Sequence, residues 1–375
     1  MSNMSQLRPT SALVDLDVLR ENLVQVRAHL PQGVKVLAAV KGDAYGHCAT
    51  LCASALEAAG VEWFGVALVE EGRELREHGI TGRILCLGGA GPFGGDEAIR
   101  LGLTPLVSHI DEARGLNEAA ARAGKSIAIH IKVDTGMGRL GVPIHLWAHF
   151  LDRLAELPHL EVEGIASHLA TSEGPDGRVS TREQTRRFEE AIAMARHRGF
   201  KAPLVHLANS GAILQHPNTA FDMVRPGLLL YGYDPGFAKP RIPVHPVMTV
   251  KTQVLVVRDL PEGVGVSYGG RFKTQRPSRL ATLPVGYADG YPRALTDKAE
   301  VLVHGCRAPV RGRVCMDMCM VDVTDVPHEV RPGDEVVLLG TQGEESITAN
   351  DLAGWADTIP YEILSRFSGR IPRLS

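Results

Sequence analysis

A lysine ends the first strongly apolar segment of the chain. The segment VKVLAAVK begins at residue 34 and ends at Lys41. Its run of small and β-branched residues predicts a buried strand, so Lys41 is expected at the carboxyl end of that strand. A lysine there is either a solvated charge or a nucleophile that forms Schiff bases once its neighbours lower its pKa. The lysine alone does not decide between these two possibilities.

Other polar residues that could take part in chemistry follow later apolar segments. The segment IKVDTGMGRLGV contains Arg139, whose planar guanidinium suits carboxylate or phenolic oxygens, although its glycines also fit an ordinary tight loop. HLANSG places Asn209 and Ser210 at the expected start of a helix, where backbone amides either bind phosphate or receive a simple side-chain cap. His168 ends the sixth apolar segment, and a single histidine in such a place is more often a packing residue than a catalyst.

The apolar segments alternate with segments of helical period between residue 34 and about residue 230. The expected strands begin near residues 34, 63, 83, 103, 126, 160, 204 and 222. This α/β alternation predicts a (β/α)8 TIM-type barrel, with an open doubly wound sheet as the alternative. No GxGxxG follows the first expected strand, which weakens the dinucleotide-binding form of the open sheet. Strands one, seven and eight are neighbours in a closed barrel, so Lys41, Asn209 and Arg225 are expected near one another.

The pattern changes after about residue 240 to alternating apolar and polar positions separated by Gly, Pro and Asp. We therefore predict a barrel domain over residues 1–240 and a β-rich domain over 241–375. Two helix starts are also expected. Thr181 with Gln184 reads as a capping box, and Thr348 with Asp351 caps a short helix that stops before residue 360.

Composition excludes several classes of protein. The 375 residues are 44% hydrophobic and 22% charged, as in ordinary globular proteins, and a net charge of −3 makes nucleic acid an unexpected partner. No signal peptide or membrane-spanning segment is recognisable, so we expect a cytoplasmic protein. The six cysteines lie mostly in apolar stretches, and we expect neither disulfides nor a metal site, although two C-x3-C pairs occur.

The segment VKGDAYGH, which contains Lys41, resembles the pyridoxal-phosphate attachment segment of the alanine racemase family. It differs at Gly42, where the family usually has alanine. Four further segments extend the resemblance from about residue 10 to about residue 370. The resemblance implies an isomerase that interconverts L-alanine and D-alanine by two-base proton transfer on pyridoxal 5′-phosphate. Its product would supply peptidoglycan synthesis.

The resemblance also assigns roles within the expected barrel. Lys41 would carry the cofactor, and Arg139 would bind its phenolic oxygen and the substrate carboxylate. Lys132 matches a lysine that some family members carry as a carbamate. Arg225 would face the pyridine nitrogen, whereas related barrel decarboxylases place a carboxylate there. His168 would join a hydrogen-bonded chain, and phosphate contacts would come from Tyr45, Asn209, Ser210, Gly227, Leu228 and Tyr361.

The second domain would complete the site. The resemblance makes Tyr268, in GVGVSYGGRF, the second catalytic base, although S-Y-G-G alone suits a turn. The Met316 amide in CMDMCM would meet the substrate carboxylate, and Tyr287 in GYADGY would be a gate. The family's head-to-tail homodimer would place Lys41 and Tyr268 of different subunits in one site.

Three alternatives remain open from the sequence. The same fold could racemise serine, lysine or several amino acids, because the width of the pocket decides the substrate. A non-catalytic carrier of the cofactor is a second alternative, but such single-domain barrels lack a β-rich second domain and Tyr268. A purely structural barrel is the third, and seven matched positions contradict it.

Overall fold

The computed structural model describes residues 8–174, 177–236 and 240–375, and its contacts divide the chain into two compact units. One unit comprises Leu19–Ala44 and Ala49–His245. The other comprises the chain through Val18, the short segment Tyr45–Cys48 and Pro246–Ser375. We call them the barrel unit and the β-rich unit.

Eight parallel strands form the barrel unit, and all eight coincide with the strands expected from the sequence. They are β2 (Lys35–Ala39), β3 (Trp63–Val66), β4 (Arg83–Cys86), β5 (Thr104–Val107), β6 (Ile127–Asp134), β8 (Leu160–Ala166), β9 (Leu204–His206) and β10 (Met223–Val224). The sheet order is β10-β2-β3-β4-β5-β6-β8-β9, and the short β7 (Val142–Pro143) pairs beside β6. Hydrogen bonds from Asp222 N to Val205 O and from Arg225 N to Ala208 O bring its two ends together. The predicted (β/α)8 barrel is therefore confirmed as a nearly closed barrel.

A hydrophobic cluster fills part of the barrel interior, and seven strands each contribute one residue to it. The members are Leu37, Trp63, Leu85, Leu106, Ala166, Leu204 and Met223. The one remaining barrel strand, β6, contributes no residue to this cluster. It carries instead the buried polar residues His130 and Lys132 at alternate positions. One side of the barrel interior is thus polar by sequence.

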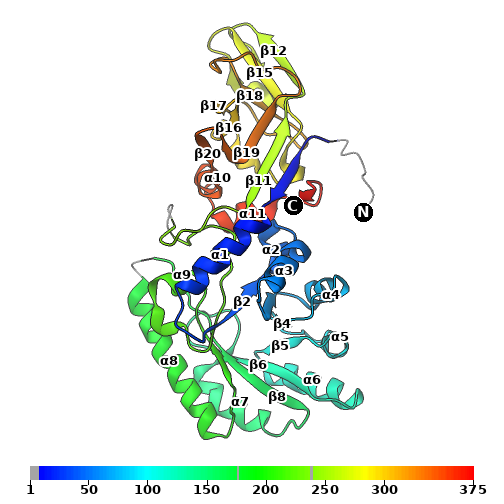
Figure 1. Ribbon diagram of the computed structural model, residues 1–375, viewed down its shortest axis with the longest axis vertical. Helices are drawn as coiled ribbons and strands as arrows, with labels where there is room; N and C mark the ends of the chain where they lie inside the picture. Colours follow the sequence, from blue (N-terminus) through cyan, green and yellow to red (C-terminus); the bar gives the residue numbers. More distant parts are fainter. Residues whose placement is uncertain (1–7, 175–176, 237–239) are drawn as a thin grey trace. The chain divides into compact units, whose positions relative to one another are not determined.

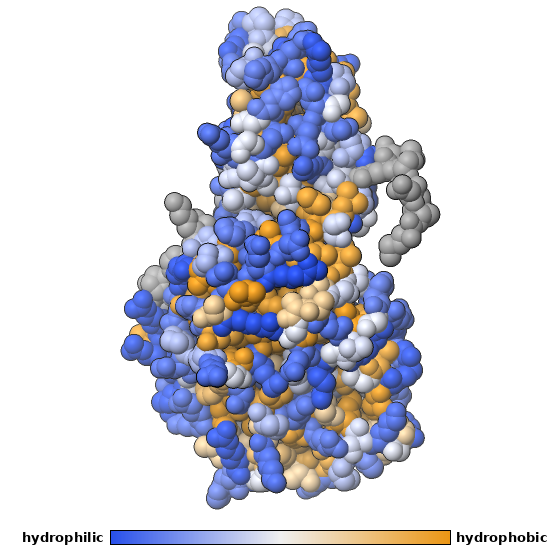
Figure 2. All heavy atoms as spheres, in the orientation of Figure 1, coloured by the Kyte–Doolittle hydropathy of each residue, from blue (hydrophilic) through white to orange (hydrophobic). Residues whose placement is uncertain are grey.

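Helices lie on the outside of these strands (Figure 1). They are α1 (Leu16–Ala28), α3 (Ala49–Ala58), α4 (Val69–Glu77), α5 (Gly95–Leu101), α6 (Ile110–Arg122), α7 (Trp147–Leu154), α8 (Arg178–His197) and α9 (Ser210–Gln215). In α6 the buried residues recur every three or four positions, at Ala113, Leu116, Ala119 and Ala120. On the face seen in Figure 2, hydrophilic and hydrophobic residues are interspersed.

Two sheets dominate the β-rich unit. The larger one has the order β17-β16-β19-β11-β1-β21, with β20 beside β19, and the smaller one has the order β12-β15-β18. The strands are β1 (Ser11–Val14), β11 (Met248–Gln253), β12 (Val256–Leu260), β15 (Ser278–Leu283), β16 (Glu300–Val303), β17 (Cys306–Pro309), β18 (Cys319–Asp322), β19 (Glu335–Gln342), β20 (Glu345–Ile347) and β21 (Arg373–Leu374). A two-stranded hairpin, β13 (Gly265–Val266) with β14 (Phe272–Lys273), comes between β12 and β15 along the chain. The N-terminal strand β1 pairs with β11 and β21, whereas the sequence analysis had included it in the barrel domain.

The two expected helix caps have different outcomes. Thr348 caps α10 (Ala349–Ala356), and its hydroxyl accepts from Asp351 N while the Asp351 carboxylate accepts from Thr348 N, as predicted. The capping box at Thr181 and Gln184 is wrong, because α8 already begins at Arg178. A further helix, α11 (Pro360–Arg366), follows α10. Among the described residues no helix is both long and apolar enough to cross a membrane.

Candidate active site

Lys41 follows β2 and begins α2 (Lys41–Gly46), a turn of unusual handedness. Every residue from 42 to 46 has a positive φ, including Asp43, Ala44 and Tyr45 at 53°, 54° and 55°. Left-handed backbone is costly for residues with a Cβ, so surrounding contacts must impose this conformation. Glu71, on α4, supplies one of them, because its carboxylate accepts from Gly42 N at 2.6 Å and from Ala67 N at 2.6 Å. Nothing in the sequence pattern singles out Glu71 for this role.

The side chain of Lys41 lines a cavity of about 200 Å³ at the carboxyl ends of the barrel strands. Three further cations share this wall: Lys132, Arg139 and Arg225. The remaining lining residues are neutral, and among the described residues of the wall none is acidic. A concave site lined by four basic side chains favours an anionic ligand, because such a ligand offsets their mutual repulsion.

Burial changes the protonation of both lysines. Burial, and then the charges of Arg139 and Arg225, lower the pKa of Lys41 from its usual value. Burial, Arg225 and Arg139 lower the pKa of Lys132 to about 8. Both amines are therefore closer to their neutral, nucleophilic form than free lysines are.

Arg225 follows β10 and is buried with four acceptors around it. Its guanidinium donates to His206 Nδ1 at 2.7 Å, Ser167 O at 2.8 Å, Leu207 O at 2.9 Å and His168 Nδ1 at 3.2 Å. All four acceptors are neutral, and burial lowers the pKa of Arg225 to about 10, so it remains a cation at neutral pH. The arginine is thus rigidly held without a carboxylate partner.

His168 is a polar member of this site rather than a packing residue. Burial, followed by the charges of Arg225 and Lys132, lowers the pKa of His168 to about 2. The ring is therefore neutral, and because its Nδ1 accepts from Arg225, its proton lies on Nε2. Gln184 on α8 fixes the segment around His168, since its Nε2 donates to His168 O at 3.0 Å and its Oε1 accepts from Ala170 N at 2.9 Å. The supposed capping residue thus positions a loop of the site.

Two loops complete the part of the site that the barrel unit forms. The Asp134 carboxylate accepts from the amides of Gly136, Met137 and Gly138, and so shapes the turn that leads to Arg139. The helix expected at this point is present, and Asn209 caps α9, where its carboxamide oxygen accepts from Ala212 N at 3.0 Å.

Ser210 joins the loops that follow β9 and β10. Its hydroxyl accepts from Gly227 N at 2.9 Å, and Leu228 is buried in the same loop. Four of the residues expected at the phosphate thus lie on two adjacent loops of the barrel: Asn209, Ser210, Gly227 and Leu228.

The remaining expected site residues lie in the β-rich unit. Tyr268 occupies a turn between β13 and β14 and is 72% exposed, and Met316 is 53% exposed. Both line a hollow of about 860 Å³ together with Met318 and Met320. Ser267 links their segments, because its hydroxyl donates to Arg313 O at 2.7 Å.

Tyr287 and Met316 belong to neighbouring segments as well. Tyr287 N donates to Cys315 O, and Ala288 N donates to Met316 O, each at 3.0 Å. Tyr361 is on α11, and its ring centroid lies 6.0 Å from that of Tyr45. The structure thus groups these four residues as two pairs within the β-rich unit.

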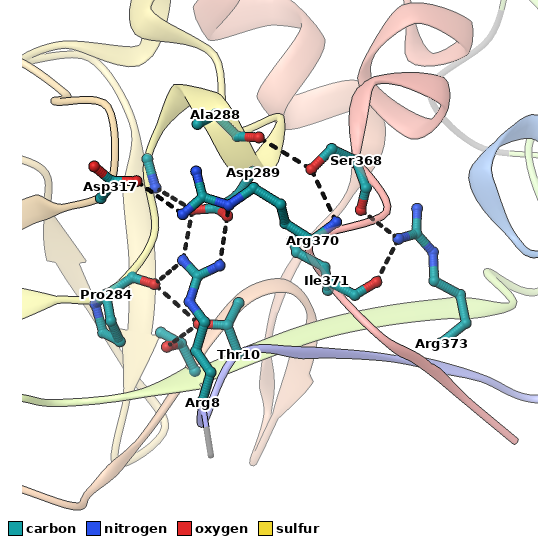
Figure 3. A network of polar contacts seen from close by, with 12 residues as sticks. Arg8, Thr10, Pro284, Ala288, Asp289, Asp317, Ser368, Arg370, Ile371 and Arg373 are labelled. Atoms are coloured by element: carbon teal, nitrogen blue, oxygen red, sulfur yellow. Dashed lines mark hydrogen bonds and ion pairs between the residues drawn. The ribbon is translucent and has the colours of Figure 1, made fainter. Parts of the chain in front are cut away.

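A buried carboxylate holds the Tyr287 and Met316 segments in place (Figure 3). Asp289 is fully buried and forms two hydrogen bonds with Arg8, at 2.5 and 2.6 Å, and it accepts from Gly286 N at 2.9 Å. Arg370 approaches Asp289 at 3.3 Å and binds Asp317 at 2.8 Å. The sequence pattern does not predict this network, and its signal is a single acidic residue, Asp289, in the segment LPVGYADGY.

Both units match known protein families. The family model of the alanine racemase N-terminal domain matches residues 14–235, and that of the alanine racemase C-terminal domain matches residues 247–375. The chain belongs to the alanine racemase family. The alanine racemases of Halothermothrix orenii and Symbiobacterium thermophilum are 43% and 44% identical to it, covering 98% and 99% of this chain and 96% and 98% of their own lengths.

Solved structures of the alanine racemase family agree with this assignment. A crystal structure of alanine racemase from Streptomyces lavendulae is 38% identical, with a TM-score of 0.93 over 99% of this chain and 97% of its own. That of Bartonella henselae, which has covalently bound pyridoxal phosphate, is 32% identical, with a TM-score of 0.88 over 98% of this chain and 99% of its own. The family and the fold expected from the sequence are confirmed, and the chain is a racemase of the isomerase class.

Proposed function

We propose that this racemase interconverts L-alanine and D-alanine with pyridoxal 5′-phosphate bound to Lys41. The observation that carries the proposal is the cavity at the end of β2, where Lys41 lies among three other cations and no described lining residue is acidic. A phosphate, a phenolate and a substrate carboxylate supply the negative charges that this wall requires. The lowered pKa of Lys41 favours the neutral amine that forms a Schiff base with an aldehyde.

The residues present fit the cofactor group by group. Arg225 would face the ring nitrogen, and Arg139 would bind the phenolic oxygen and the substrate carboxylate. His168 lies beside Arg225, to which it is hydrogen-bonded. The phosphate contacts would come from Tyr45, Asn209, Ser210, Gly227, Leu228 and Tyr361.

Arg225 favours racemisation over decarboxylation. When bound, the cofactor withdraws electrons from the substrate and so acidifies the Cα proton. Arg225 is a buried cation that can only donate hydrogen bonds, so it keeps a facing nitrogen unprotonated and moderates this withdrawal. Moderate withdrawal suits the removal and return of one proton. A carboxylate at this position would instead favour the stronger withdrawal that decarboxylation needs.

Two bases move the proton at Cα. The Lys41 amine would act on one face of the substrate and the Tyr268 hydroxyl on the other, each serving as acid or base according to direction. His168 supports Tyr268 in this role. Its ring is neutral with the proton on Nε2, so it can donate to the tyrosine oxygen and favour the phenolate.

We infer that Tyr268 acts in the site of a second subunit, in a head-to-tail homodimer. Tyr268 and Met316 are each more than half exposed and line a wide hollow with the apolar side chains of Met318 and Met320. Such a hollow is suited to cover another chain. The Met316 amide would then bind the substrate carboxylate, and Tyr287 would stand at the entrance as a gate.

We also propose that Lys132 carries a carbamate. Its pKa of about 8 leaves a fraction of neutral amine at neutral pH. The ammonium loses one proton to give the neutral amine, whose nitrogen adds to the carbon of carbon dioxide as one C=O π bond opens. The new N–C group then loses a second proton, so that overall a cation becomes an anion. That anion would offset part of the positive charge of Arg139 and Arg225 on the same wall.

A racemisation assay across the twenty amino acids, with chirality-sensitive detection, tests the proposed function. The purified protein loaded with pyridoxal 5′-phosphate should racemise alanine faster than serine, lysine or any other amino acid. Equal rates on several amino acids would favour a broad-specificity racemase. Binding of the cofactor without racemisation of any amino acid would favour a carrier.

The role of the product is a further part of the proposal. D-alanine from this reaction would supply peptidoglycan synthesis. Cytoplasmic placement stays a prediction from the sequence.

A further inference from the structure

A chain of buried histidines leads from Arg225 into the barrel. Arg225 Nη1 lies 2.7 Å from His206 Nδ1, and His206 Nε2 lies 2.7 Å from His130 Nδ1. Both rings are completely buried, and burial lowers the pKa of each, so both are neutral. Arg225 directly follows β10, His206 ends β9, and His130 lies within β6.

The direction of every hydrogen bond in this chain is determined. Arginine has donors and no acceptor, so His206 Nδ1 must accept and its proton must lie on Nε2. His206 Nε2 therefore donates to His130 Nδ1, which places the proton of His130 on Nε2 as well. Fixing either ring in the opposite tautomer would break the contact to Arg225.

A carboxylate lies where the chain ends. His130 Nε2 is buried and has no hydrogen-bond partner within normal distance, and Glu163 Oε2 lies 3.7 Å from it. Arg83 donates to the same carboxylate oxygen at 2.5 Å. A small shift of Glu163 gives the His130 N–H its acceptor, and a carboxylate accepts hydrogen bonds but cannot donate one when ionised.

Two local features of β8 place Glu163 and His130 together. β6 and β8 pair at Ile129 with Val162 and resume at His130 with Gly164, so Glu163 is an extra residue in a β-bulge. Bulges turn a side chain away from the direction that regular alternation would give it. At Gly164 a Cβ would lie 2.5 Å from His130 Nδ1, so only glycine leaves room for the ring.

Core packing alone does not account for this arrangement. Trp63 packs beside His130, with ring centroids 5.3 Å apart, and apolar side chains fill the surrounding interior. An apolar residue at 130 would fill the same space without burying ring nitrogens. The bulge, the glycine and the directed hydrogen bonds are instead explained together if the histidines orient Arg225.

We propose that His130 and Glu163 are positioning residues that hold Arg225 in place through His206. The carboxylate fixes the tautomer of His130, His130 fixes that of His206, and His206 then offers Arg225 a lone pair in one direction. The inference rests on the proposed function in assigning Arg225 to the cofactor ring. The tautomers themselves do not depend on that assignment.

Neutron diffraction from the deuterated holoenzyme reads the tautomers directly. The expected result is deuterium on Nε2 and none on Nδ1 in both His206 and His130. Deuterium on Nδ1 of either ring would overturn the proposal. Because this measurement needs no turnover, it decides the hydrogen-bonded chain even if the protein racemises no alanine, in which case the proposed function alone fails.

Matched variants of β8 then test the effect on catalysis. Glu163→Leu removes the acceptor, and we expect kcat for alanine to fall about tenfold with little change in KM. A loss of this size is usual when a residue that orients a site residue through hydrogen bonds is removed. Glu163→Gln keeps an acceptor oxygen and should recover most of kcat. Glu161→Leu, at an exposed position of the same strand, should behave as the unaltered protein.

The contrary outcomes are distinct from one another. If Glu163→Leu lowers the melting temperature and leaves kcat unchanged, the role of Glu163 is structural and the proposal is wrong. If Glu163→Gln is as impaired as Glu163→Leu, the ion pair with Arg83 matters rather than the acceptor, and the proposal is wrong as well.

Discussion

Lys41 and Lys132 line the same cavity in similar surroundings, but their proposed roles differ. Burial and the charges of Arg139 and Arg225 disfavour the ammonium form of both Lys41 and Lys132. Their positions differ, because Lys41 follows β2 whereas Lys132 is within β6. The residue types were evident from the sequence, and so was the position of Lys41 at a strand end. The shared burial was not, because it depends on the side chains of other strands.

Replacing Lys41 by alanine removes the proposed attachment point. We expect Lys41→Ala to lose the visible absorbance of the covalently bound cofactor and its racemase activity, while the far-UV circular dichroism stays unchanged. Lys132→Ala is the matched control, since it removes an amine from the same wall and should retain the absorbance. An unchanged absorbance spectrum in Lys41→Ala would contradict the assignment of Lys41.

The proposed carbamate on Lys132 predicts a pH dependence of defined sign. Only the neutral amine adds carbon dioxide, and the pKa of Lys132 is about 8, so the ammonium form dominates below that pH. At a fixed pressure of ¹³C-labelled carbon dioxide, the carbamate ¹³C NMR signal should rise as the pH rises through about 8. Lys132→Ala should lack the signal at every pH. A signal that persists in this variant belongs to another amine and would refute the modification of Lys132.

The least predictable element is the left-handed turn after β2. Its sequence, KGDAYG, has glycine at only two of the five positions with positive φ, so the sequence does not predict the left-handed conformation. Tertiary contacts such as that of Glu71 with Gly42 N impose it. The eight strands, by contrast, were predictable, because each follows from a short apolar run that the barrel buries on both faces.

Capping signals were reliable only where no tertiary contact competed with them. Thr348 and Asp351 satisfy each other locally and form the predicted cap. Gln184 has the same spacing from Thr181, but its carboxamide binds Ala170 N and His168 O, so it serves the site instead of the helix start. A sequence pattern cannot reveal that a side chain has a better partner far along the chain.

Alanine substitutions at the two glycines of the left-handed turn test its conformation. Gly42 has φ 62°, and a Cβ added there would have no atom within 4 Å, whereas at Gly46 the φ is 82° and Leu364 O would lie 2.2 Å from the added Cβ. Gly42→Ala should lower the free energy of unfolding by about 1–2 kcal/mol, the usual cost of left-handed backbone. Gly46→Ala should lower it by more, because the oxygen must also move. Urea denaturation measures both, and equal losses would contradict the difference in space.

The two proposed bases, Lys41 and Tyr268, belong to different units of the molecule. Lys41, Lys132, Arg139, His168 and Arg225 belong to the barrel unit, and Tyr268 belongs to the β-rich unit. The sequence did not reveal that β1 completes the β-rich sheet, since a segment as short as SALV fits either sheet equally well. A protein with its bases on separate units can bring them together between two subunits, and this possibility has a quantitative test.

Mixed dimers distinguish a shared site from a site within one chain. Lys41→Ala and Tyr268→Phe are each expected to be nearly inactive, and the two proteins are dissociated, mixed in equal amounts and reassembled so that subunits pair at random. About half of the dimers are then mixed, and in each of these one site carries both substitutions while the other carries neither. Activity should recover to about a quarter of the unaltered value per subunit, by this symmetry alone. Native mass spectrometry verifies the exchange of subunits. If exchange is complete and activity stays at the level of the separate variants, both bases act within one chain and the proposed head-to-tail site is wrong.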